Sequence, residues 1–204
     1  MKRITQDVQN HPQTRAIIYP VKIIQDCEIK DDAEITKAWT ILNQKYALGS
    51  QYDYLARFAK QYKLKLEVGL ESSERSKATN TIKAETSLLL SESEDYKVYS
   101  IDIRNSSENG IIIFENILLP ATIWHMSKLE EIEEYKRLGF EKTIRKTWFC
   151  HRPVLGLPCG HCNPCKDCLN EGLAFRVPKL GYVLGEIRRI YHGLGRRISK
   201  LLFS

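Results

Sequence analysis

The strongest constraint on this chain of 204 residues is a group of cysteines near its C-terminal end. Five of the six cysteines lie within one short segment, at Cys150, Cys159, Cys162, Cys165 and Cys168. Cysteines this close together in an intracellular protein are typical of metal binding, because disulfides do not persist in the cytosol. We therefore expect this segment to fold around a metal ion.

Four of these cysteines suit a tetrahedral zinc site. Structural zinc takes four sulfur or nitrogen ligands, with zinc–sulfur bonds of about 2.3 Å. A Cys-x-x-Cys turn can place two thiolates on one ion, and Gly160 and Pro164 suit the tight backbone between closely spaced ligands. The cysteine at position 150 can close the shell from the far side of the loop. The predicted zinc ligands are Cys150, Cys159, Cys162 and Cys165.

Some alternatives remain open at this stage. Cys168 is surplus and could replace Cys150, and His151 or His161 could substitute for a thiolate. An iron–sulfur cluster is the main rival to zinc. The bacterial ferredoxin run is Cys-x2-Cys-x2-Cys-x3-Cys-Pro, whereas the last gap here is two residues and Leu169 follows.

Composition and hydropathy favour an ordinary globular protein. The chain is 43% hydrophobic and 27% charged, which is enough apolar material for one core and a small appendage. No apolar run approaches the roughly 20 residues that a membrane span needs. The first residues lack the apolar segment of a signal peptide. We therefore expect a cytoplasmic protein with no membrane partner.

Basic residues concentrate in the tail. After Phe175 the chain carries seven arginines and lysines and one glutamate, so the net charge of this segment is +6. The formal net charge of the whole chain is also +6. A basic tail suggests an anionic partner such as nucleic acid, a phosphate ligand or an acidic protein, although a solvated helix face is an equal alternative. A helix from about Leu184 to Leu202 would carry an apolar stripe, which we expect to dock on the body. The stripe comprises Ile187, Ile190, Tyr191, Leu194, Ile198 and Leu201.

The rest of the chain reads as alternating helices and strands. Residues 72–96 read as a long loop with a helical segment around 82–90. The last two expected strands are interpreted as a hairpin. Such alternation predicts an α/β layer fold with an at least partly parallel sheet. Expected helices cover 1–15, 50–62 and 127–138, and expected strands cover 16–24, 64–70, 98–103 and 110–114.

The cysteine segment resembles the zinc loop of the 7-cyano-7-deazaguanine synthase family, which has the form Cys-x8-Cys-Gly-x-Cys-x2-Cys. Residues 150–165 reproduce that spacing and its glycine. Upstream, Gly49-Ser50-Gln51 is similar to the family's Pro-Gly-Arg-Asn helix start. Pro120 followed by Lys128-x-Glu130 looks like the family's proline and Lys-x-Glu stretch before a helix. The resemblance covers most of residues 16–178.

The resemblance implies a Rossmann-like sheet of the adenine nucleotide alpha hydrolase type and a cytoplasmic ligase of the queuosine pathway. Such enzymes use ATP and ammonia to convert 7-carboxy-7-deazaguanine into an amide and then a nitrile. The family's ATP loop, Ser-Gly-Gly-x-Asp-Ser, does not occur here. We therefore expect a sheet that is incomplete at the N-terminus, with ATP bound through another chain or a homo-oligomer.

The resemblance also implies a domain division and a substrate site. Residues 1–146 would form a partial Rossmann-like domain, 147–178 the zinc loop and 179–204 the basic helical tail. Gly49, Ser50, Gln51 and Lys128 become candidates for binding a purine-like substrate; helix capping for the first three, and a solvent-facing lysine at a helix start, are the plainer alternatives. No catalytic residue can be named. The alternative function is a non-catalytic zinc module that binds nucleic acid or protein through the tail.

Overall fold

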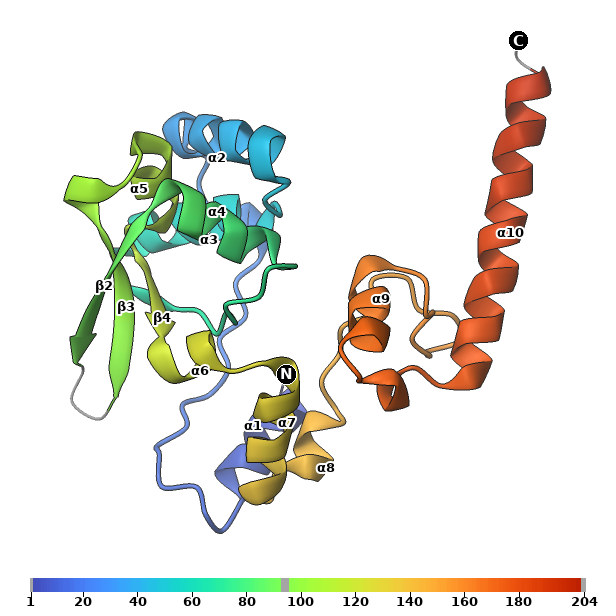
Figure 1. The fold of residues 1–204 in the computed structure, drawn as a ribbon, viewed down its shortest axis with the longest axis horizontal. Coiled ribbons are helices and arrows are strands. Elements are labelled where there is room, and N and C mark those ends of the chain that lie inside the picture. The colour runs from blue at the N-terminus through green and yellow to red at the C-terminus, as the bar shows by residue number, and fades with distance from the viewer. Residues whose placement is uncertain (1, 93–95, 203–204) are drawn as a thin grey trace. The chain divides into compact units, whose positions relative to one another are not determined.

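The computed structural model describes residues 2–92 and 96–202, and the side-chain surroundings up to Tyr191. The chain divides into two compact units (Figure 1). One unit consists of residues 22–127, and the other joins residues 1–21 to residues 128–204. The division therefore falls within the range 1–146 that the sequence assigns to a single α/β domain.

The unit of residues 22–127 is built on a four-stranded mixed sheet with the order β1-β4-β3-β2. Strand β1 (Leu66–Glu67) pairs parallel to β4 (Ile117–Pro120). Strand β3 (Lys97–Asp102) runs antiparallel to both β4 and β2 (Ser87–Glu92). This arrangement confirms the α/β class, with one parallel and two antiparallel pairs among the described strands.

Four helices pack beside this sheet (Figure 1): α2 (Ala33–Tyr46), α3 (Gln51–Tyr62), α4 (Lys77–Glu85) and α5 (Glu108–Phe114). Short helices η1 (Asp26–Glu28), η2 (Ile103–Asn105) and α6 (Ala121–His125) complete the unit. The core lies between helices and strands, where burial of apolar surface stabilises the fold. Its most buried large side chains are Ile35, Leu42, Leu48, Ile82, Ile113 and Phe114.

Helix α2 is not among the elements expected from the sequence, although its residues carry helix signals. Asp32 accepts a hydrogen bond from the backbone N–H of Ile35, which caps the helix start. Ile35, Ala38 and Leu42 then follow at spacings of three and four and are buried. The polar residues between these three positions make the helical spacing hard to recognise from the sequence.

Two expected strands are wrong. Residues 16–24 form no strand, because Pro20 lacks an N–H donor and the apolar side chains there, such as Ile17, are largely exposed. Residues 110–114 belong to helix α5, which begins where Ser107 accepts a hydrogen bond from the N–H of Gly110. The hairpin partner of β3 is therefore β2, which begins at Ser87, within the helical segment expected around 82–90; the helix there is α4, which ends at Glu85.

The second unit contains α1 (Lys2–Gln9), α7 (Lys128–Arg137) and α8 (Glu141–Ile144). Gly139 has φ +78°, so it ends α7 in the left-handed conformation expected of a helix stop. The unit continues through the cysteine loop to α9 (Asn163–Asn170), η3 (Ala174–Arg176) and the long helix α10 (Lys179–Leu202). Among the described helices, none combines the length and apolar character needed to cross a bilayer.

Candidate metal centre

The cysteine loop is shaped by a tight turn between its first two cysteines. Val154 and Leu157 exchange two backbone hydrogen bonds of 3.0 and 2.9 Å. Between them, Leu155 and Gly156 both have positive φ, +49° and +76°, as a type I′ hairpin turn requires. This turn reverses the chain, so that Cys150 returns to the side of the later cysteines.

The four predicted ligands come together in one cluster. Their sulfur atoms all lie within 4.8 Å of one another, and the Cys150 and Cys162 sulfurs are 3.9 Å apart. A tetrahedron with bonds of 2.3 Å has sulfur–sulfur edges of about 3.8 Å, so the spacing suits a single ion. Cys165 is fully buried and Cys162 keeps 9% of its surface exposed. The cluster could therefore hold a metal ion such as zinc.

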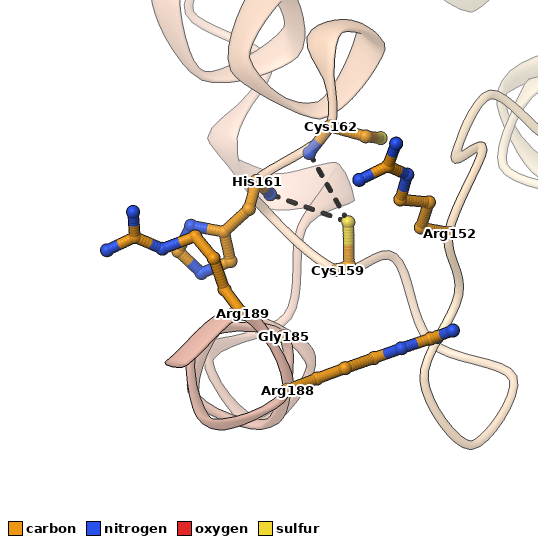
Figure 2. Close-up of a pocket in the computed structure, with 7 residues that line it drawn as sticks. All are labelled: Arg152, Cys159, His161, Cys162, Gly185, Arg188 and Arg189. Atoms are coloured by element: carbon orange, nitrogen blue, oxygen red, sulfur yellow. Dashed lines mark hydrogen bonds between the residues drawn. The ribbon is translucent and has the colours of Figure 1, made fainter. Parts of the chain in front are cut away.

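Backbone N–H groups point at two of the sulfurs. The N–H of Cys159 donates to Cys150 Sγ at 3.3 Å. The N–H groups of His161 and Cys162 donate to Cys159 Sγ at 3.5 and 3.4 Å, shown as dashed lines in Figure 2. Gly160 makes this turn possible with φ +74°. Such N–H donors surround sulfur atoms that would serve as metal ligands, and they would help to orient them.

The thiols do not share one pKa. Burial alone would raise the pKa of Cys162, but hydrogen bonds from the backbone and from neighbouring thiols lower it to about 7. Burial raises the pKa of Cys150, and burial together with the adjacent Cys162 raises that of Cys165. The negative charge of one thiolate thus makes deprotonation of a neighbouring thiol unfavourable. A divalent cation would remove this repulsion, which fits a metal-binding role.

The alternative ligands lie outside the cluster. Cys168 packs with Ile132, Leu173 and Val177 in a separate apolar cluster. The His161 ring is engaged elsewhere, because its Nε2 lies 3.0 Å from Tyr182 O and its Nδ1 lies 3.3 Å from Glu186. The described metal-site group contains neither histidine.

Helix α10 packs directly on the backbone of the cysteine loop. A Cβ atom added at Gly181 would lie 2.4 Å from Pro158 O, and one added at Gly185 would lie 2.0 Å from Cys159 O. Only glycine permits such an approach. The Tyr182 ring packs against the His161 ring in a tilted arrangement, with a centroid distance of 4.4 Å. This glycine face was not expected from the sequence, although the spacing of four residues between Gly181 and Gly185 indicates it.

A cavity of about 340 Å³ lies beside the cluster (Figure 2). Its lining includes three arginines and no acidic residue. Arg188 donates to Pro153 O at 3.1 Å, while the Arg152 guanidinium extends toward the Cys162 side chain in Figure 2. Arg189 pairs with Glu186 at the edge. The lining residues are Arg152, Cys159, His161, Cys162, Gly185, Arg188 and Arg189.

The expected substrate residues belong to both units. Gly49, Ser50 and Gln51 lie at the start of α3, where Ser50 makes no side-chain cap hydrogen bond and Gly49 O accepts from Trp39 Nε1 at 3.2 Å. Lys128 lies in the other unit and pairs with Glu131 at 3.0 Å. Their role in binding a substrate stays a prediction.

The docking expected for the apolar stripe of α10 is not seen at the three positions whose side chains the structure describes. Ile187, Ile190 and Tyr191 are more than half exposed. The other three positions of the stripe, Leu194, Ile198 and Leu201, lie outside the described side chains. The helix instead contacts the cysteine loop through its glycines, so the apolar face is directed elsewhere.

Comparison with known proteins adds no further identification: no family model, no curated protein and no solved structure matches this chain.

Proposed function

We propose that the four-cysteine cluster holds a structural zinc ion and that the chain is a divergent relative of the 7-cyano-7-deazaguanine synthases. The observation that carries this proposal is the Cys-x8-Cys-Gly-x-Cys-x2-Cys spacing, whose four sulfurs lie at single-ion distances around a glycine with φ +74°. The zinc would hold the loop rigid, because four ligands on one ion replace the apolar core that so short a segment lacks.

In this proposal the chain contributes to ATP-dependent conversion of a 7-carboxy-7-deazaguanine-like carboxylate and ammonia into an amide or nitrile. A carboxylate resists attack by ammonia until it is activated, which is the role of ATP. The sequence contains no Ser-Gly-Gly-x-Asp-Ser loop. The phosphate site of a Rossmann-like fold would therefore come from another chain, or from a longer form of this one.

The experiment combines metal analysis with an assay. We would quantify zinc in the purified chain and follow ATP consumption with 7-carboxy-7-deazaguanine and ammonium, detecting the nitrile by mass. The assay would be repeated with an added chain that carries the ATP loop. Zinc together with product in either mixture supports the proposal. Zinc without product in both mixtures refutes the ligase role but leaves the zinc site standing, whereas iron or no metal refutes the site.

A second candidate function is a nucleic-acid-binding module, which the arginine-lined cavity favours. Arg152 and Arg188 line it beside the cysteine loop, and Arg188 and Arg189 project from the basic helix α10. Guanidinium groups bind phosphate in bidentate fashion. A phosphodiester chain could therefore pass over the loop and contact several arginines.

This candidate predicts salt-dependent binding. Removing one arginine that binds a phosphate should reduce the slope of log K against log salt by about 1. The double variant Arg152→Ala/Arg188→Ala should reduce the slope by about 2. Arg137→Ala, an exposed arginine paired with Glu134 outside the cavity, serves as the control. An unchanged slope in the double variant would exclude the cavity as the phosphate site.

A further inference from the structure

Helix α10 presents an apolar face to solvent. Five large apolar side chains at spacings of three, four, three and one lie on one side of the helix. They keep between 52% and 78% of their surface exposed. We call this set the α10 apolar face: Leu180, Val183, Ile187, Ile190 and Tyr191.

The exposed face is unusual because the helix is already anchored by another face. An amphipathic helix normally buries its apolar stripe and exposes its polar side. Here Gly181 and Gly185 approach the loop backbone, and Arg188 donates to Pro153 O at 3.1 Å. Successive helical residues turn by about 100°, which places Gly185 well away from the direction of Leu180 and Ile187. The cysteine loop thus holds the helix while the apolar face stays uncovered.

The sequence extends this face beyond the described side chains. Leu194, Ile198 and Leu201 continue the same spacing, and α10 runs to Leu202. From Leu180 to Leu202 a helix covers about 33 Å at 1.5 Å per residue. An apolar stripe of this length is longer than a single small pocket could accept.

Charge identifies the kind of surface that the face would meet. Arg188 and Arg189 lie on the polar side of the helix, where they line the cavity beside the cysteine loop, and the sequence adds Arg196, Arg197 and Lys200 farther along the helix. The helix contains one acidic residue, Glu186. A helix with one apolar face, a basic polar side and low overall hydrophobicity has the pattern of an interfacial helix on anionic lipid.

We propose that the α10 apolar face binds the surface of a bilayer that contains anionic lipid. The helix would lie in the plane of the interface, with its apolar side chains among the acyl chains and the basic residues of its C-terminal part, Arg196, Arg197 and Lys200, near the headgroup phosphates. The cysteine loop on the opposite side of the helix would stay in water. This binding needs no spanning segment, but it departs from the sequence-based expectation that the protein has no membrane partner. It is independent of the ligase reaction.

The test is co-sedimentation of the full-length, zinc-loaded chain with vesicles. One set contains phosphatidylcholine alone and the other contains phosphatidylcholine with phosphatidylserine. The double variant Ile187→Glu/Ile190→Glu removes the apolar contact. Leu155→Glu is the matched control, because Leu155 is 85% exposed on the hairpin of the cysteine loop, away from the apolar face. Circular dichroism and zinc content would verify that each variant is folded.

The expected result is binding to the mixed vesicles that weakens as salt shortens the Debye length from about 10 Å at 0.1 M to about 3 Å at 1 M. The double variant should lose at least about tenfold in partitioning, since lipid affinity follows the apolar area buried, while Leu155→Glu should bind like the wild type. Equal loss in both variants would overturn the proposal. So would absence of binding at low salt, or a concentration-dependent dimer, abolished by Ile187→Glu/Ile190→Glu, in place of vesicle binding.

Discussion

Replacing Gly185 by alanine tests the packing of α10 on the cysteine loop. The added Cβ would lie 2.0 Å from Cys159 O, whereas carbon–oxygen contacts are ordinarily no closer than about 3.3 Å. The helix must therefore move by about 1.3 Å, or the loop must deform. The loop has little freedom to do so, because Cys159 is flanked by hydrogen bonds to two sulfurs.

The magnitude follows from two opposing effects. Overpacking of this kind costs about 1–3 kcal/mol, and a contact with a fixed carbonyl belongs at the upper end. Alanine also stabilises a helix interior by about 1 kcal/mol relative to glycine. The net loss in docking free energy is therefore about 2 kcal/mol, which corresponds to about a 30-fold change in the opening equilibrium.

Native-state hydrogen exchange of the α10 amides measures that equilibrium. Gly185→Ala should exchange about 30-fold faster over residues 182–191 than the wild type. Gly193→Ala, in the same helix, provides the control for helix propensity and should exchange no faster than the wild type. Both variants should retain zinc, because no ligand changes. Protection in Gly185→Ala equal to or above that of the wild type would refute the close approach.

The remaining predictions concern the metal ligands, a buried ion pair and a pH dependence. Cys162→Ser should lower bound zinc to near zero while Cys168→Ala retains it, because Cys168 packs in a separate apolar cluster; equal zinc in the two variants by elemental analysis would contradict the ligand assignment. Asp53→Ala should lower the free energy of unfolding by about 3 kcal/mol, since it removes the 2.8 Å partner of the buried Arg57 guanidinium. A decrease below about 1 kcal/mol, measured by thermal unfolding, would show that this ion pair contributes little to stability. Burial alone would raise the pKa of Glu85, but hydrogen bonds from a lysine, a serine and a tyrosine lower it from 4.5 to about 2. These hydrogen bonds stabilise the folded protein above pH 4.5, and that stabilisation is lost as the pH falls toward 2. Glu85→Gln should therefore lower the free energy of unfolding by about 1–2 kcal/mol at neutral pH and change it little near pH 2. A pH-independent difference in unfolding free energy would count against this reasoning.

The sequence predicted those parts of the protein in which a local pattern is sufficient. The cysteine spacing identified the four clustered thiols, because closely spaced ligands meet by local turns. Helix α3 and strand β3 followed from apolar periodicity. Gly139 ended α7 as its conformational freedom suggested. In each case the residues involved lie within 15 positions of one another, the separation of Cys150 and Cys165.

Other segments were decided by distant contacts. Residues 111–113 are β-branched isoleucines, but they belong to helix α5, because the helix buries Ile113 and Phe114 in the core beside α2. Residues 16–24 have strand composition without a neighbouring strand to accept their hydrogen bonds. Strand propensity reflects packing on a sheet more than an intrinsic backbone preference. The absence of a sheet partner therefore outweighs composition.

The sequence by itself thus determined the α/β class, the four cysteines that cluster and the basic, amphipathic character of the tail, since all three follow from residue type and spacing. Only the tertiary structure decided that Cys168 lies apart from the other thiols, that three arginines gather at one cavity, and that α10 turns its glycines to the loop and its apolar face to solvent. The physical reason is steric. Which face of a helix approaches a neighbour depends on backbone-to-backbone distances, and those distances exist only once the elements are packed together.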